Sequence, residues 1–233
     1  MNWNIVKGAC LALLPVAGTL KAQEKPNIVV ILADDLASNE ISCYGGKNLK
    51  TPNIDRIAEE GIRFTNNFAS CAMSVPIRAS LYTGLYPARH GSYQNHKISY
   101  SDIKSVTYYL PQAGYRVGRA GKTHTVPKSV FNFEKVPGFE ENCIAVTADY
   151  TVDGIRDFMR QDSPFCLFVC STLSHAPWTC GNKDEFDADK VILPPNCVDN
   201  KGTRELFRRL LAEIRALDLS LIHISEPTRR SYI

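Results

Sequence analysis

Residues 27–35, Asn-Ile-Val-Val-Ile-Leu-Ala-Asp-Asp, decide the fold class of this 233-residue chain. The run within residues 27–33 does not alternate and is rich in β-branched side chains. Such a run is typical of a strand buried on both faces of a mainly parallel sheet. Residues 165–171, Phe-Cys-Leu-Phe-Val-Cys-Ser, repeat this pattern, and residues 115–120 predict a further strand. We therefore expect an α/β fold with a mainly parallel central sheet flanked by helices.

Helical patterns separate these strands. Residues 51–61 begin with Thr-Pro and end in Gly, with apolar side chains at helical spacing between them. Residues 148–160 and 204–218 also predict helices, and the second carries a clear apolar stripe. After the first helix, we expect residues 62–64 to return the chain to the sheet.

The bulk composition is that of an ordinary globular protein. Hydrophobic residues make up 44% and charged residues 22%, enough apolar material to build a core. The net charge of +3 is too small to indicate a nucleic-acid partner, and we expect none.

The N-terminus has the pattern of an export signal over residues 1–22. Lys7 supplies the positive charge, residues 8–20 the apolar region, and Leu20-Lys21-Ala22 a small-residue cleavage site. The competing interpretation is an uncleaved anchor, but the apolar run of about thirteen residues is short for a membrane span. We therefore expect a periplasmic or secreted protein with no membrane span after cleavage.

Two adjacent carboxylates, Asp34 and Asp35, follow the first predicted strand directly. Open α/β sheets bind their ligands at the carboxyl ends of their strands. Adjacent negative charges are costly unless a cation or hydrogen-bond donors compensate for them. Taken alone, the pair is equally compatible with a solvated turn, so its interpretation as metal ligands depends on the motifs that follow.

Residues 74–84, Ser-Val-Pro-Ile-Arg-Ala-Ser-Leu-Tyr-Thr-Gly, predict a short helix with a reactive start. Pro76 suits the first helical position and Gly84 the exit, which places Ser74 just before the helix N-terminus. Free backbone N–H groups there favour an anion, and Arg78, about one turn later, can bind a tetrahedral oxyanion. A plain Ser-x-Pro helix start with a surface arginine is the structural alternative.

Two histidine-containing segments complete the candidate site. In Gly121-Lys122-Thr123-His124, an extended backbone would place Lys122 and His124 on the same side. In Ser174-His175-Ala176-Pro177-Trp178, the histidine follows the strand 165–171. A solvated loop for the first segment, and a turn histidine packed beside Trp178 for the second, are the structural alternatives.

Together these motifs resemble the type I, formylglycine-dependent sulfatases, with a Ser-type signature at residues 74–84. The family has the alkaline-phosphatase-like fold. The resemblance implies that a serine-type maturation enzyme oxidises Ser74 to formylglycine. It also implies one Ca²⁺ ion, rather than Mg²⁺, bound by Asp34, Asp35 and residue 74.

The resemblance implies roles for the remaining site residues in removing sulfate from a sulfated carbohydrate. A hydroxyl of the hydrated formylglycine, activated by the metal, would attack the sulfur atom of the sulfate ester. Arg78 and Lys122 would stabilise the charge that develops on the sulfate oxygens. His175, or a group missing from this chain, would protonate the departing alcohol, and His124 would deprotonate the second hydroxyl when sulfate leaves. The rival interpretations are a metal-dependent phosphoesterase of the same superfamily and a non-catalytic protein that binds sulfated glycans.

The resemblance covers residues 25–218, which we interpret as the N-terminal part of a sulfatase catalytic domain. Residues 219–233 fit neither the preceding helix nor the family and resemble translated sequencing-adapter sequence. We therefore expect a non-native tail on a truncated chain, the alternative being a divergent native tail. The family's later metal-ligand pair and second lysine have no counterpart here, so we expect this fragment to be inactive.

Overall fold

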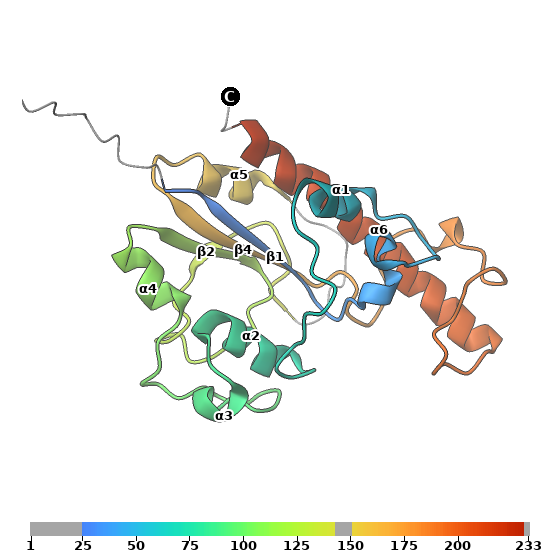
Figure 1. The fold of residues 1–233 in the computed structure, drawn as a ribbon, viewed down its shortest axis with the longest axis horizontal. Helices are drawn as coiled ribbons and strands as arrows, with labels where there is room; N and C mark the ends of the chain where they lie inside the picture. Colours follow the sequence, from blue (N-terminus) through green and yellow to red (C-terminus); the bar gives the residue numbers. More distant parts are fainter. Residues whose placement is uncertain (1–24, 143–150, 231–233) are drawn as a thin grey trace, which may run out of the picture.

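The computed structural model describes residues 25–142 and 151–230 and shows helices packed on both sides of a sheet (Figure 1). The four strands described are β1 (Ile28–Ala33), β2 (Arg116–Gly121), β3 (Glu134–Val136) and β4 (Phe165–Ser171). Their order is β1-β4-β2-β3, and every neighbouring pair is parallel. The expected parallel sheet is confirmed, and the two later predicted strands lie within one residue of β2 and β4.

The helices connect the strands and cover both faces of the sheet. They are α1 (Pro52–Glu60), α2 (Ser74–Thr83), α3 (Pro87–His90), α4 (Val106–Gln112), α5 (Asp153–Met159) and α6 (Lys201–Arg230). Three short 3-10 turns lie at Ser38–Glu40, Ser42–Tyr44 and Lys183–Glu185. In Figure 1, α2, α3 and α4 lie on one side of the sheet, and α5 and α6 on the other.

The two faces of β4 supply two separate cores. Cys166, Phe168 and Cys170 pack with Ala79 and Tyr82 of α2, together with partly buried side chains of α4. The intervening Phe165, Leu167 and Val169 face the other way and form a second cluster with side chains of α5 and α6. All seven residues of β4 are buried, as the apolar run predicted.

The strand register brings three carboxyl ends to the same place. Ala33, the last residue of β1, pairs with Ser171, and Gly121, the last residue of β2, pairs with Cys170. The residues after these strands, beginning with Asp34 and Lys122, therefore emerge side by side at one edge of the sheet. Ligands bind at this edge in open α/β folds.

Two predictions about the edge of the fold are wrong. β1 is only half-buried, with Ile28 at 36% exposure, because it lies at one edge of the described sheet and has a partner on one side alone. Residues 62–64 form no strand, and Ile62 and Phe64 are 81% and 67% exposed. An apolar sequence can pair only where a neighbouring strand is available, and none of the described strands lies beside it.

Three helix boundaries also differ from the prediction. α2 begins at Ser74 with Met73 as N-cap, two residues before Pro76. Proline fits there too, because the first four helical N–H groups have no partner in their own helix. α6 continues through residues 219–230, and Leu221 extends its buried stripe, so the expected end at residue 218 is wrong. α5 begins at Asp153, while residues 148–150 lie outside the described part.

Some N-terminal and C-terminal predictions are not tested. The predicted signal peptide, residues 1–22, lies outside the described residues, and the native or foreign origin of residues 219–233 stays a prediction. No helix in the described part of the chain combines the length and apolar character needed to span a membrane.

Candidate active site

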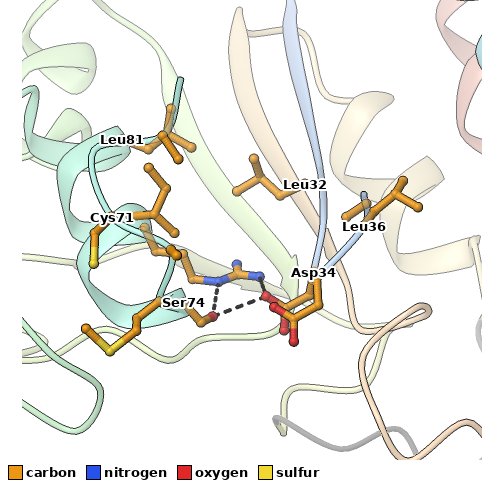
Figure 2. Close-up of a pocket in the computed structure, with 13 residues that line it drawn as sticks. Leu32, Asp34, Leu36, Cys71, Ser74 and Leu81 are labelled. Carbon is orange, nitrogen blue, oxygen red and sulfur yellow. Dashed lines mark hydrogen bonds and ion pairs between the residues drawn. The ribbon is translucent and has the colours of Figure 1, made fainter. Parts of the chain in front are cut away.

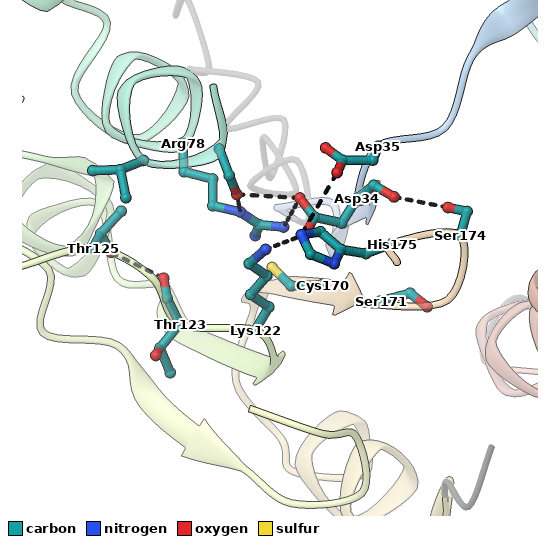
Figure 3. A network of polar contacts seen from close by, with 12 residues as sticks. Asp34, Asp35, Arg78, Lys122, Thr123, Thr125, Cys170, Ser171, Ser174 and His175 are labelled. Atoms are coloured by element: carbon teal, nitrogen blue, oxygen red, sulfur yellow. Dashed lines mark hydrogen bonds and ion pairs between the residues drawn. The ribbon is translucent and has the colours of Figure 1, made fainter. Parts of the chain in front are cut away.

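Asp34 lies at the centre of a cluster of charged side chains at the carboxyl edge of the sheet (Figure 3). Its backbone N–H donates to Ser171 O of β4 at 3.2 Å, which fixes the first residue beyond β1. The side chain is only 6% exposed and forms ion pairs with both Arg78 and Lys122. The segments that follow β1, β2 and β4 and the start of α2 therefore meet around the Asp34 carboxylate.

The start of α2 places Ser74 and Arg78 against Asp34. Ser74 Oγ donates to Asp34 Oδ1 at 3.2 Å, and Arg78 Nε donates to Ser74 Oγ at 3.2 Å. Arg78 Nη2 completes the triangle by donating to Asp34 Oδ1 at 3.2 Å. Arg78 is one turn after Ser74, so its guanidinium folds back toward the helix N-terminus as the sequence predicted.

Lys122 reaches Asp34 because the chain turns sharply after β2. Gly121 has φ +83°, and a Cβ at this position would lie 2.2 Å from Cys170 O. Only glycine fits so close to the neighbouring strand. The turn directs Lys122 inward, where its side chain is fully buried and its Nζ donates to Asp34 Oδ2.

The two cations keep Asp34 ionised. Burial alone would raise the pKa of its carboxyl. The hydrogen bond from Lys122 and the positive charges of Arg78 and Lys122 outweigh burial, so the pKa lies below its ordinary value. Asp34 is therefore a buried carboxylate at neutral pH.

His124 lies beside these cations as a neutral base. Both ring nitrogens are buried without a hydrogen-bond partner in the described structure, and the ring packs on His96 with centroids 5.8 Å apart. Burial first, then the charges of Lys122 and Arg78, lower the pKa of His124 to about 4. Its φ of +42° shows that the segment is not extended, so the predicted proximity to Lys122 holds but the predicted backbone does not.

His175 faces the two adjacent carboxylates. Its Nε2 lies 3.6 Å from Asp35 Oδ2 and 4.0 Å from Asp34 Oδ2. Its Nδ1 lies 2.6 Å from Ala176 O, a contact that requires the proton on Nδ1 and leaves Nε2 free toward the site. Asp35 itself is at φ +57° and largely exposed, so it bounds the site from the solvent side.

The sequence analysis thus predicted seven residues that the fold brings together. Asp34, Ser74, Arg78 and Lys122 are joined by hydrogen bonds, and Asp35 and His175 adjoin them. His124 joins them through packing and charge rather than through a direct hydrogen bond.

Comparison with known protein families identifies the family to which this chain belongs. Residues 26–191 match the family model described as Sulfatase. The chain belongs to the sulfatase family. All the residues of the charged cluster, from Asp34 to His175, lie within the matched range.

Individual sulfatases agree with this assignment. The chain is 38% identical over 161 residues to an ulvan-active sulfatase from Formosa agariphila, covering 66% of this chain and 31% of that protein. It is 34% identical over 185 residues to the human N-sulphoglucosamine sulphohydrolase, covering 75% and 36% respectively. The chain therefore spans about a third of the length of these sulfatases.

Structural comparison agrees with the alkaline-phosphatase-like fold. The phosphonate monoester hydrolase of Agrobacterium radiobacter superposes with a TM-score of 0.68 at 19% identity, covering 89% of this chain and 60% of that one. At this identity the likeness concerns the fold alone. The predicted fold class is confirmed.

A cavity of about 300 Å³ opens beside the sulfatase signature (Figure 2). Asp34, Asp35 and Ser74 form its polar end, while Leu32 and Leu81 lie along its walls. Ile77, on the first turn of α2, also lines it. The cavity beside Ser74 is therefore partly apolar.

The residues present fit a hard divalent cation in donor type but supply only part of its shell. Asp34 and Asp35 offer carboxylate oxygens, and Ser74 Oγ lies 3.2 Å from Asp34 Oδ1. Calcium takes six to eight oxygen ligands. In the described part of the chain, no group of three or more His, Cys, Asp or Glu side chains is arranged to hold a metal.

Sequence reasoning missed two residues that support this sulfatase site. Asn95 Oδ1 accepts from Val75 N at 3.0 Å and so caps α2 from a distant loop, because Met73 provides no side-chain cap. Glu213 of α6 binds the backbone on both sides of His175. A charged residue three positions after Leu210, on the apolar stripe of a helix, is the one sequence signal that could have revealed Glu213.

Proposed function

We propose that this chain is the N-terminal part of an exported sulfatase that hydrolyses a sulfate ester on a carbohydrate, using formylglycine made from Ser74 and a bound Ca²⁺ ion. The observation that carries the proposal is a buried pair of cations, Arg78 and Lys122, beside the residue-74 hydroxyl. Arg78 Nη1 is buried and has no hydrogen-bond partner in the described structure. An unpaired buried guanidinium nitrogen suits an oxygen of a sulfate group.

Arg78 and Lys122 would bind and orient the sulfate. Both side chains are at least 95% buried, so their charges act with little solvent screening. Arg78 also contacts residue 74, so the same guanidinium fixes both the nucleophile and the group attacked. Charge that develops on the sulfate oxygens would be stabilised by cations already in place.

The two histidines are suited to opposite proton transfers. His124, with its pKa lowered to about 4, is neutral at pH 7 and can accept a proton from a hydroxyl of residue 74. His175, once its Nε2 is also protonated, would deliver that proton to the departing alcohol. When present, the divalent cation and formylglycine would supply Lewis acidity and a nucleophilic oxygen of suitable reactivity.

The relatives support a sulfated carbohydrate as the substrate class. One relative is named for its activity on ulvan and another for hydrolysis of N-sulphoglucosamine. The export-signal pattern at residues 1–22 agrees with a substrate outside the cytoplasm. In the part of the chain that the structure describes, Asp34, Asp35 and Ser74 supply only part of the six to eight ligands that Ca²⁺ takes, so we expect the 233-residue chain to be inactive.

The deciding experiment is the mass of the peptide that contains residue 74, after coexpression with a serine-type maturation enzyme. Oxidation of serine to formylglycine removes two hydrogens, so we expect a loss of about two mass units. Ser74→Ala, expressed identically, should show no loss, and a known Ser-type substrate controls for enzyme activity. An unmodified Ser74 beside a modified control would contradict the proposal.

The rivals are separated by a second measurement on the gene extended at its 3′ end. Turnover of sulfate esters but not phosphate esters is expected. Preferential turnover of phosphate esters would favour a metal-dependent phosphoesterase, a class whose fold the hydrolase from Agrobacterium radiobacter shares. Binding of a sulfated glycan without turnover, in a chain that carries formylglycine, would favour a non-catalytic binding protein.

A further inference from the structure

Glu213 is a fully buried carboxylate that the reaction outlined above does not use. It lies on α6, where its Oε2 accepts from Ser174 N at 3.2 Å and its Oε1 accepts from Cys180 N at 2.9 Å. These two amides bracket the segment that carries His175. The single side chain therefore ties both ends of residues 174–180, the histidine loop, to one helix.

Ser174 transmits this attachment to the active site. Its Oγ donates to the backbone O of Asp34 at 2.8 Å, and its own O accepts from Trp178 Nε1 at 3.1 Å. Its φ of +84° is unusual for a residue other than glycine and needs surrounding contacts to hold it. The next residue is His175, so the Ser174 backbone sets where that ring begins.

Burial raises the pKa of Glu213, and the backbone N–H groups of Cys180, Ser174 and Thr179 oppose that rise by binding its ionised form. Two backbone N–H groups point at Glu213 from opposite ends of the loop, and each needs an acceptor. Glutamine has nearly the same shape but offers one acceptor oxygen, and its amide NH₂ would face a second donor. No salt bridge to Glu213 occurs in the described residues, so the loop amides are its main compensation for burial.

We propose that Glu213 is a positioning residue that holds the histidine loop so that His175 faces Asp34 and Asp35. The consequence for catalysis rests on the proposed function, whereas the positioning itself does not. Among the described residues, Glu213 is not one of those that line the cavity beside Ser74. It acts on His175 through the loop backbone, which it binds at Ser174 and Cys180.

The test is NMR on the 233-residue chain with Glu213→Gln, using Glu205→Gln as the matched control. Glu205 lies on the same helix but bonds Lys183 and Arg209 at the surface, away from the histidine loop. Amide hydrogen exchange is measured at Ser174 and Cys180, relative to Val169 in the centre of β4. The ring resonances of His175 are followed in the same samples.

In Glu213→Gln we expect exchange at Ser174 or Cys180, relative to Val169, to accelerate about tenfold, as one lost hydrogen bond allows. The His175 ring resonances should shift, and Glu205→Gln should change neither. An unchanged exchange ratio, an unchanged His175 ring, or equal effects in both variants would overturn the proposal.

A second variant keeps the test decisive if the first one does not fold. If Glu213→Gln does not fold, Glu213→Asp keeps both acceptor oxygens but shortens their reach, and it is judged by the same ratio and the same resonances. Both readouts are independent of formylglycine formation at residue 74. Failure of the positioning role is therefore distinguishable from failure of the proposed sulfatase chemistry.

Discussion

β1 and β4 lie side by side and have nearly the same kind of sequence, yet the fold uses them differently. Every residue of β4 is buried, and its two faces supply two cores. No residue of β1 is buried, but the residue that follows it, Asp34, is the most heavily paired carboxylate of the site. An apolar run thus predicts a strand. The neighbouring elements decide whether its own side chains are buried in the core or whether its main contribution is the position of the residue that follows it.

Asp34→Ala should have the largest effect on stability. It leaves the buried Arg78 and Lys122 without their shared carboxylate, and removing one partner of a buried ion pair costs about 3–5 kcal/mol. Urea unfolding of the two proteins measures the difference. Asp35→Ala is the matched control, because its side chain is 58% exposed and should change stability by less than about 0.5 kcal/mol. Equal losses of unfolding free energy in Asp34→Ala and Asp35→Ala would show that the ion pairs of Asp34 do not stabilise the fold.

Leu167→Ala should destabilise more than Ile31→Ala, although both remove an aliphatic side chain from a parallel strand. Leu167 is 0% exposed, and a large-to-small change in such a core costs about 2–5 kcal/mol. Ile31 is only half-buried, so its loss should lie near or below the lower end of that range. Thermal unfolding followed by circular dichroism would rank the two. A larger loss for Ile31→Ala would mean that β1 stabilises the fold along its length after all.

Asn95→Ala should cost about 1 kcal/mol, the usual loss when a helix cap is removed. The Val75 N–H then lacks its acceptor at the start of α2, the helix that brings Ser74 and Arg78 to the end of β1. Chemical denaturation measures the change, and Gln94→Ala, an exposed neighbour, is the control. A loss no greater than that of the control would show that solvent caps this helix equally well.

A pH dependence of stability is expected from His124. Its pKa in the folded chain is about 4 against an ordinary 6.5, so the unfolded chain binds more protons between these values. The free energy of unfolding should therefore rise as the pH is raised from about 4 to 6.5. It should fall as the pH is lowered through the same range, because the buried ring must then take up a proton. In His124→Gln the profile should be flatter over that window, as measured by urea midpoints at several pH values. A profile unchanged by the substitution would exclude this cause.

The sequence predicted what depends on local pattern and spacing. The strands near 28, 116 and 165, and the group formed by Asp34, Ser74, Arg78 and Lys122, follow from periodicity, helix-start signals and the family motifs. It could not predict the half-burial of β1, since burial depends on which strand lies alongside. It also missed Glu213, because a carboxylate that binds distant backbone N–H groups leaves no repeating pattern in the sequence.

The strand order has a consequence for synthesis on the ribosome. β4 is the last of the four strands to be made, yet it lies between β1 and β2. Until residues 165–171 emerge, no described strand can hold the ends of β1 and β2 together, and Lys122 has no scaffold that brings it to Asp34. At about 5–20 residues per second, residue 74 is translated on the order of 10 s before this closure. The site can therefore assemble only after β4, the strand between β1 and β2, has been made.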